Sequence, residues 1–225
     1  MARLVYPRIA ASLILLLFLL VIALFILISF DLIGQAFRKL GFPPEYSIIL
    51  LILSLLGSYI NIPVREITSQ ESVLSGQAID FYWFRYILPP LAVERRTIIA
   101  INLGGAIIPV AVSVFLLTRV NLFDALTGIL VMTLLIHMMA RPVRGLGIAV
   151  PALIPPVMAA IFALIISPQD APMIAYISGT LGSLIGADLL NFKKIPELQV
   201  AVASIGGAGT FDGIFLTGII SVLIA

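Results

Sequence analysis

The stretch Ile9–Phe30, IAASLILLLFLLVIALFILISF, is an apolar run without a single charged residue. A helix that crosses the hydrocarbon core of a bilayer needs about 20 mostly apolar residues, so this run is long enough to span. Arg3 and Arg8 precede it, as in a signal peptide. However, the run is longer than a signal h-region and no small-residue cleavage site follows it. The stretch is therefore interpreted as a retained membrane span.

The rest of the chain has the same apolar character. Of its 225 residues, 61% are hydrophobic and 11% are charged, whereas a soluble domain carries about 25% charged residues. The segments predicted to span are Ile9–Phe30, Tyr46–Ile62, Ile98–Leu117, Leu122–Ala140, Leu146–Ile166, Ala171–Asn191 and a last one ending at Ala225. The sequence thus predicts an all-α polytopic membrane protein with about seven transmembrane helices, located in the cell membrane as a multi-pass protein.

The predicted spans form one membrane domain over residues 1–225. Within it, residues 1–62 make a two-helix part, residues 63–97 a cytoplasmic or interfacial connection, and residues 98–225 a five-helix part. Lys and Arg collect in cytoplasmic connections. The N-terminal side carries ten of the 13 cations, namely Arg3, Arg8, Arg65, Arg85, Arg95, Arg96, Arg141, Arg144, Lys193 and Lys194. The N-terminus is therefore predicted inside and the C-terminus outside.

The connection 63–97 mixes polar stretches with aromatic clusters at residues 81–84 and 86–88. Clustered aromatic side chains beside a span are typical of an interfacial belt. The same β-rich composition is compatible with a hairpin on the cytoplasmic face. Both interpretations stay open at the level of the sequence.

Two acidic residues fall inside the predicted spans and away from the segment ends. A charge at such a position is costly and marks a functional candidate. They are Asp188, in the sixth segment, and Asp212, in the last one. Gly206–Gly209 is a poor helix interior, and Gln199–Ile205 is a short β-branched run. We therefore expect a short extended cytoplasmic element before a last helix that begins near Gly207, which brings the two carboxylates to the same depth.

Two carboxyl groups held close together cannot both ionise readily. Such a pair can act as base and acid on water and a carbonyl group, as in aspartic proteases. The same residues also fit two other interpretations. One is a transporter or channel in which the aspartates carry protons or cations, and the other is a non-catalytic scaffold whose glycines serve only helix packing.

The order of these motifs resembles the presenilin and signal-peptide-peptidase class of intramembrane aspartyl proteases. Asp188 stands near the cytoplasmic end of an inward-running segment, and Gly209 and Asp212 resemble the Gly-x-Gly-Asp motif on the next one. Pro151, Ala152 and Leu153 resemble the Pro-Ala-Leu motif of that class, in permuted order. A more literal resemblance, over residues 206–213 and 140–143, is to an uncharacterised prokaryotic membrane family of unknown function.

The protease resemblance implies an intramembrane aspartic endopeptidase with Asp188 and Asp212 as its catalytic dyad. The residues expected to bind substrate or shape the site are Pro151, Ala152, Leu153, Gly209, Gly213, Val200 and Val202. The implied partners are the lipid bilayer and a membrane-embedded peptide substrate, while the oligomeric state stays open. The chain has no cysteine and one histidine, so no metal site is expected, and no cofactor is implied. Its net charge of +2 is too small and too scattered to suggest a nucleic-acid partner.

Overall fold

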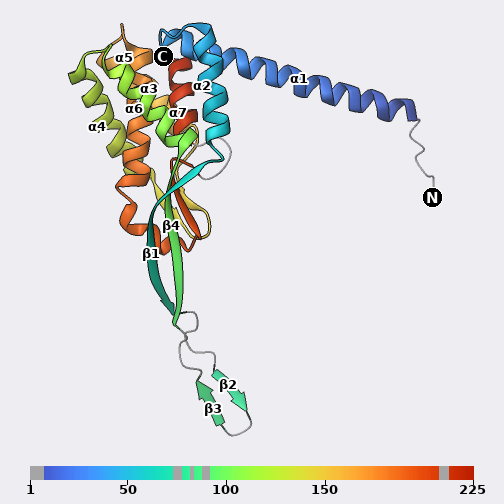
Figure 1. Ribbon diagram of the computed structural model, residues 1–225, viewed down its shortest axis with the longest axis vertical. Helices are drawn as coiled ribbons and strands as arrows, with labels where there is room; N and C mark the ends of the chain where they lie inside the picture. The colour runs from blue at the N-terminus through green and yellow to red at the C-terminus, as the bar shows by residue number, and fades with distance from the viewer. Residues whose placement is uncertain (1–7, 73–77, 82–83, 88–91, 208–212) are drawn as a thin grey trace.

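The computed structural model describes residues 8–72, 78–81, 84–87, 92–207 and 213–225. It consists of a helical body, a long β-hairpin that projects from one end of the body, and helix α1, which leaves the body at the other end (Figure 1). The helices are α1 Arg8–Lys39, α2 Pro44–Gly57, η1 Leu103–Ile107, α3 Ile108–Leu117, α4 Leu122–Met139, α5 Ile154–Ile166, α6 Ala171–Ser183, η2 Leu184–Leu189, η3 Phe192–Leu198 and α7 Gly213–Ile224. The strands are β1 Asn61–Ser72, β2 Ala78–Phe81, β3 Phe84–Ile87, β4 Ala92–Asn102, β5 Arg141–Val143, β6 Gly147–Ala149 and β7 Val202–Ile205.

Helix α6 lies at the centre of the body and packs against α3, α4, α5 and α7. Its Tyr176 is the largest fully buried side chain, and it clusters with Phe37 of α1 and Ile219 of α7. Small residues allow the close packing. A Cβ atom on Gly182 would lie 2.6 Å from the Cβ atom of Met132 in α4.

Three strands form the main sheet, in the order β1-β4-β7. β1 pairs antiparallel with β4 from Asn61 opposite Asn102 to Ser72 opposite Ala92. β7 pairs parallel with β4, with Val202 opposite Ile98 and Ile205 opposite Ile101. The outer side of β7 is therefore an edge of this sheet among the described strands. The pairs β2–β3 and β5–β6 form two further small sheets.

The prediction of an all-α polytopic fold with about seven spanning helices is wrong, because several predicted spans contain strands. The predicted span Ile98–Leu117 begins inside β4, and Leu146–Ile166 contains β6 before α5 begins at Ile154. An apolar β-branched run such as Ile98–Ile101 suits a buried strand as well as a helix. Hydrophobicity alone does not separate these two structures.

The helices are also shorter than seven spans require. In the part of the chain that the structure describes, α4 is the one helix long and apolar enough to cross a membrane. A second span results if the bent pair Ala171–Leu189 and Phe192–Leu198, with an angle of 58° between its members, is counted as one. The other apolar helices tested, at Glu45–Gly57, Leu103–Leu117, Ile154–Ile166 and Gly213–Ile224, are 10–17 residues long.

Two stretches outside the predicted spans adopt strands. Residues of the connection 63–97 lie in β1, β2, β3 and β4, so this connection is a hairpin and not a simple loop. The stretch expected to be extended before the last helix contains β7. Gln199, with a φ of 56°, ends η3, so no helix continues from Leu198. The described part of α7 begins at Gly213.

Candidate functional site

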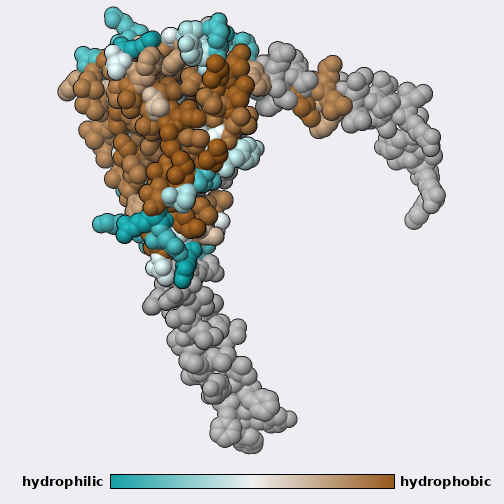
Figure 2. All heavy atoms as spheres, viewed as in Figure 1, coloured by the Kyte–Doolittle hydropathy of each residue, from teal (hydrophilic) through white to brown (hydrophobic). Residues whose placement is uncertain are grey.

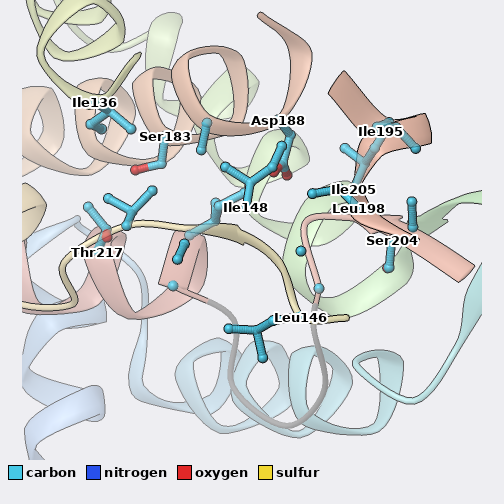
Figure 3. A pocket seen from close by; sticks show the side chains of 18 of the residues that line it. Ile136, Leu146, Ile148, Ser183, Asp188, Ile195, Leu198, Ser204, Ile205 and Thr217 are labelled. Atoms are coloured by element: carbon cyan, nitrogen blue, oxygen red, sulfur yellow. The ribbon is translucent and has the colours of Figure 1, made fainter. Parts of the chain in front are cut away.

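A cavity of about 410 Å³ lies where α6, η2, α7 and two short strands meet. Its walls come from β6 and the following residues to Pro151 and Ala152, from η2, from the segment Val200–Ile205, and from the start of α7. Figure 3 shows Ser183, Thr217 and Ile136 toward one end, Ile195, Leu198, Ser204 and Ile205 toward the other, and Asp188 and Ile148 between them. Asp188 is the one charged residue among the described residues that line it.

The π turn η2 determines which way Asp188 faces. In an α-helix, residues five apart are separated by about 140° around the axis, so Ser183 and Asp188 would lie on different faces. The wider π turn, which closes i→i+5 bonds, reduces this separation. The Leu190 N–H donates to the Ile185 carbonyl at 2.9 Å in this pattern. Both Ser183 and Asp188 therefore line the same cavity.

Asn191 holds the end of this turn in place. Its side chain is fully buried, and its Nδ2 group donates to the carbonyl oxygens of Gly186, at 3.2 Å, and Ala187, at 2.9 Å. Its Oδ1 atom accepts a hydrogen bond of 2.9 Å from Lys194 Nζ. The last carbonyl groups of a helix lack partners within the helix. Asn191 supplies such partners directly beside Asp188.

Gly206 joins Asp188 to the end of β7. Its backbone N–H donates to Asp188 Oδ2 at 2.8 Å. Gly206 has a φ of +75°, and a Cβ atom there would lie 2.5 Å from the Cβ atom of Ala106. Only glycine combines this conformation with such a close approach. The half-buried carboxyl group is thereby held by one backbone donor and remains on the cavity wall.

The structure brings most of the predicted site residues together. Those that line the cavity are Pro151, Ala152, Asp188, Val200, Val202 and Gly213. Leu153 does not line it, and 69% of its surface is exposed. The second predicted catalytic residue, Asp212, and the predicted Gly209 lie outside the described residues. Gly207 and Gly213, the described residues on either side of that segment, both line the cavity.

Sequence reasoning missed several residues of this site. Ser183 stands five positions before Asp188. In an α-helix this spacing places two residues on different faces, and only a π turn brings them to the same face. Thr217 looks like a packing residue of α7, and Asn191 looks like the end of a span. The segment Gly147–Val150 was expected inside a helix. Gly206 carried the one usable signal, because it belongs to the glycine cluster Gly206–Gly209.

By its structure, the protein is a helical body with a projecting β-hairpin. Among the described residues, one carboxyl group lines its cavity. The chain belongs to the family described as "Protein of unknown function (DUF1614)", whose sequence profile matches residues 55–224. The match covers every residue described here as lining the cavity. No curated protein and no solved structure matches the chain. This match is consistent with the resemblance to an uncharacterised family that the sequence suggested. The resemblance to aspartyl proteases stays a prediction.

Proposed function

We propose that this protein is embedded in a lipid bilayer and hydrolyses peptide bonds of membrane-embedded segments, with Asp188 as one carboxyl group of an aspartic dyad. The observation that carries the proposal is the carboxyl group of Asp188 on the wall of a 410 Å³ cavity beside an edge strand. A largely apolar pocket with few polar groups is the usual form of a binding site. The second carboxyl group is assigned to Asp212, the residue before the cavity-lining Gly213.

The surface of the helical body supports the membrane part of the proposal. Along α4, the side chains of Leu122, Leu126, Leu130, Leu134 and Met138 are each more than half exposed and recur at every fourth position. Such a continuous apolar stripe needs a membrane or a partner to cover it. Figure 2 shows apolar surface over the body, with hydrophilic residues gathered at its two ends. At 18 residues, α4 is about 27 Å long, close to the thickness of a bilayer core.

The chemistry needs only the two carboxyl groups and water. The ionised carboxylate takes a proton from water as the water oxygen attacks the carbonyl carbon of the scissile bond. The protonated carboxyl group gives its proton to the carbonyl oxygen, which yields a tetrahedral diol. The diol then collapses, the C–N bond breaks and the nitrogen takes up a proton. The products are one carboxylic acid and one amine.

Strand β7 supplies a means of presenting a peptide to the carboxyl group. A peptide bond inside a helix has its carbonyl committed to a backbone hydrogen bond, so the substrate must be extended to react. β7 forms the edge of its sheet among the described strands, and Val202–Ile205 line the cavity. An extended peptide can add to such an edge through backbone hydrogen bonds. The scissile carbonyl would then lie beside Asp188.

The test is cleavage of a fluorogenic peptide with a single apolar segment by the full chain in proteoliposomes. Asp188→Asn and Asp212→Asn are each expected to lower the rate by at least about 10³-fold, as loss of a group essential to the chemistry does. The matched control is Asp170→Asn, which removes a carboxyl group that does not line the cavity. Equal rates in all variants contradict the proposal. Proton or cation flux without cleavage would favour the transporter instead.

Membrane insertion is tested separately by flotation of the chain with lipid vesicles after alkaline carbonate extraction. The chain should float with the lipid, and Leu130→Lys should weaken flotation because a cation on the apolar stripe is costly in lipid. Leu130→Ala, which changes the same exposed position of α4 without adding a charge, is the control and should float like the wild type. Complete release by carbonate contradicts the membrane proposal and leaves the catalytic one to the cleavage assay.

A further inference from the structure

The inner end of the cavity contains hydroxyl groups that the proposed chemistry does not use. Ser183, at the end of α6, is 6% exposed, and Thr217 of α7 is 3% exposed. Both line the cavity, and the Ser183 oxygen points to the side where Thr217 lies (Figure 3). This end is thus polar although the residues around it, such as Ile136 and Ala187, are apolar.

Among the described residues, none forms a hydrogen bond with the Ser183 hydroxyl group. Buried polar groups are nearly always hydrogen-bonded, and an exception calls for an explanation. The packing around it explains why no described group reaches it. The adjacent face of the helix, at Gly182 and Gly186, is in tight contact with α4, whereas Ser183 faces the cavity.

Thr217 is oriented by close packing. A Cβ atom on Gly179 would lie 3.2 Å from the Cγ2 methyl group of Thr217. The methyl group therefore faces α6, which leaves the hydroxyl group on another side of the Cβ atom. Substitution of Thr217 by Val preserves this methyl contact and removes only the hydroxyl group.

We propose that Ser183 and Thr217 form a subsite that selects a neutral, hydrogen-bonding side chain, such as Thr or Ser, in the substrate. This inference rests on the proposed protease function. Each hydroxyl group both donates and accepts, so a substrate hydroxyl group is a matching partner. A charged side chain is excluded because no described residue at this end of the cavity has an opposite charge to pair with it.

The cleavage test uses peptides in which one Thr is moved position by position through the apolar segment, each compared with Val at the same position. Thr and Val have the same shape, so the comparison isolates the hydroxyl group. At one position the Thr peptide should be cleaved about tenfold faster, the worth of roughly one net hydrogen bond. Ser183→Ala and Thr217→Val should bring that ratio close to one without changing it at other positions.

The matched control is Thr133→Val. It also removes a buried hydroxyl group that has no hydrogen-bond partner among the described residues, but it lies outside the cavity lining. It should leave the Thr-to-Val ratio at tenfold. A ratio unchanged by Ser183→Ala and Thr217→Val, in protein that still cleaves, overturns the subsite. Cleavage that continues at the wild-type rate in Asp188→Asn would instead overturn the protease function.

A second readout does not depend on cleavage. The chain has no cysteine, so Ser183→Cys introduces a unique thiol at the inner end. A small methanethiosulfonate reagent should label it, and the Thr peptide should protect it from labelling more strongly than the Val peptide. Thr133→Cys should show no peptide protection. Equal protection by both peptides contradicts selection at this end of the cavity.

Discussion

The two π turns among the described residues, η1 and η2, are built alike but have different surroundings. Each lies at one end of an α-helix, and each is held by a buried asparagine that directly flanks or closely follows it, Asn102 for η1 and Asn191 for η2. Around η1 the backbone is in tight contact with α2, whereas η2 faces a cavity. The comparison distinguishes the hydrogen bonds that stabilise a π turn from the side chains that such a turn can direct toward a functional site.

At η1 the side chain of Asn102 and the carbonyl group of Gly104 form hydrogen bonds with other parts of the protein. Asn102 accepts from the Gly105 N–H at 2.8 Å and donates to the Ser58 carbonyl oxygen at 2.7 Å and to Asn61 Oδ1 at 3.0 Å. The Ser54 hydroxyl group donates to the Gly104 carbonyl oxygen at 2.6 Å. The turn η1 therefore fixes the position of the hairpin relative to the body.

At η2 the asparagine satisfies the backbone, but Asp188 and Ser183 remain on the cavity wall. The same local geometry thus fixes the hairpin to the body at η1 and orients side chains toward the cavity at η2. The difference comes from what lies opposite the turn, a backbone or a cavity. π turns occur often at functional sites, and here only η2 has the free space for one.

The largest expected effect is that of Gly104→Ala. A Cβ atom on Gly104 would overlap the Ser54 carbonyl oxygen and the Ser58 nitrogen, and both atoms belong to the backbone of α2 and its C-cap. We expect a loss of stability of about 4 kcal/mol or more, the range of severe core changes. Thermal unfolding in lipid nanodiscs measures it. The control Gly34→Ala, where the nearest atom lies 3.5 Å away on a flexible arginine, should unfold at or slightly above the wild-type temperature.

Asn102→Ala is next in size. It removes three hydrogen bonds from a residue that is 1% exposed, and each buried group left unpaired costs about 1–3 kcal/mol. A loss of about 3 kcal/mol is expected on the same unfolding measurement. Asn121→Ala, which removes the cap of α4 at the surface, should cost about 1 kcal/mol. Equal losses of stability in Asn102→Ala and Asn121→Ala would contradict the role of η1 in fixing the hairpin to the body.

Asn191→Ala is expected to cost about 2 kcal/mol, because the carbonyl groups of Gly186 and Ala187 lose their donor. Unlike Asn102→Ala, it should also slow peptide cleavage by about 10–100-fold, since a small displacement of a reacting group has a large effect on rate. Rate measurements at a temperature where both variants are folded separate the two effects. Asn191→Asp, which keeps the shape but removes the donor, should behave like Asn191→Ala.

Asp188→Asn is expected to have the smallest effect on stability, within about 1 kcal/mol of wild type, because functional groups are rarely optimised for stability. The amide Oδ1 atom can still accept from the Gly206 N–H. A large loss of stability would show that Asp188 is structural. Little change in unfolding together with loss of cleavage would sharpen the contrast between η2 and η1.

The apolar character of the helices and the candidate functional role of Asp188 are predictable from the sequence, because long apolar runs and isolated acidic residues are local signals. The cavity around Asp188 gathers Pro151, Ala152, Val200 and Val202, which are also singled out by the sequence. The strands within predicted spans are not predictable in the same way. Ile98–Ile101 becomes a strand because β1 and β7 are available to pair with it, and hydrophobicity carries no information about pairing partners.

The sequence by itself determined where the chain is apolar, where its few charges lie, and that Gly206 belongs to a cluster unsuited to a helix interior, since these follow from side-chain chemistry and backbone freedom. Only the tertiary structure decided that Ser183 and Asp188 share a cavity and that Leu153 does not. The first of these outcomes depends on the π turn of η2, which is held by Asn191 and packs against α4. A hydrogen bond and a helix contact formed on folding, not a periodicity in the chain, set the direction of these side chains.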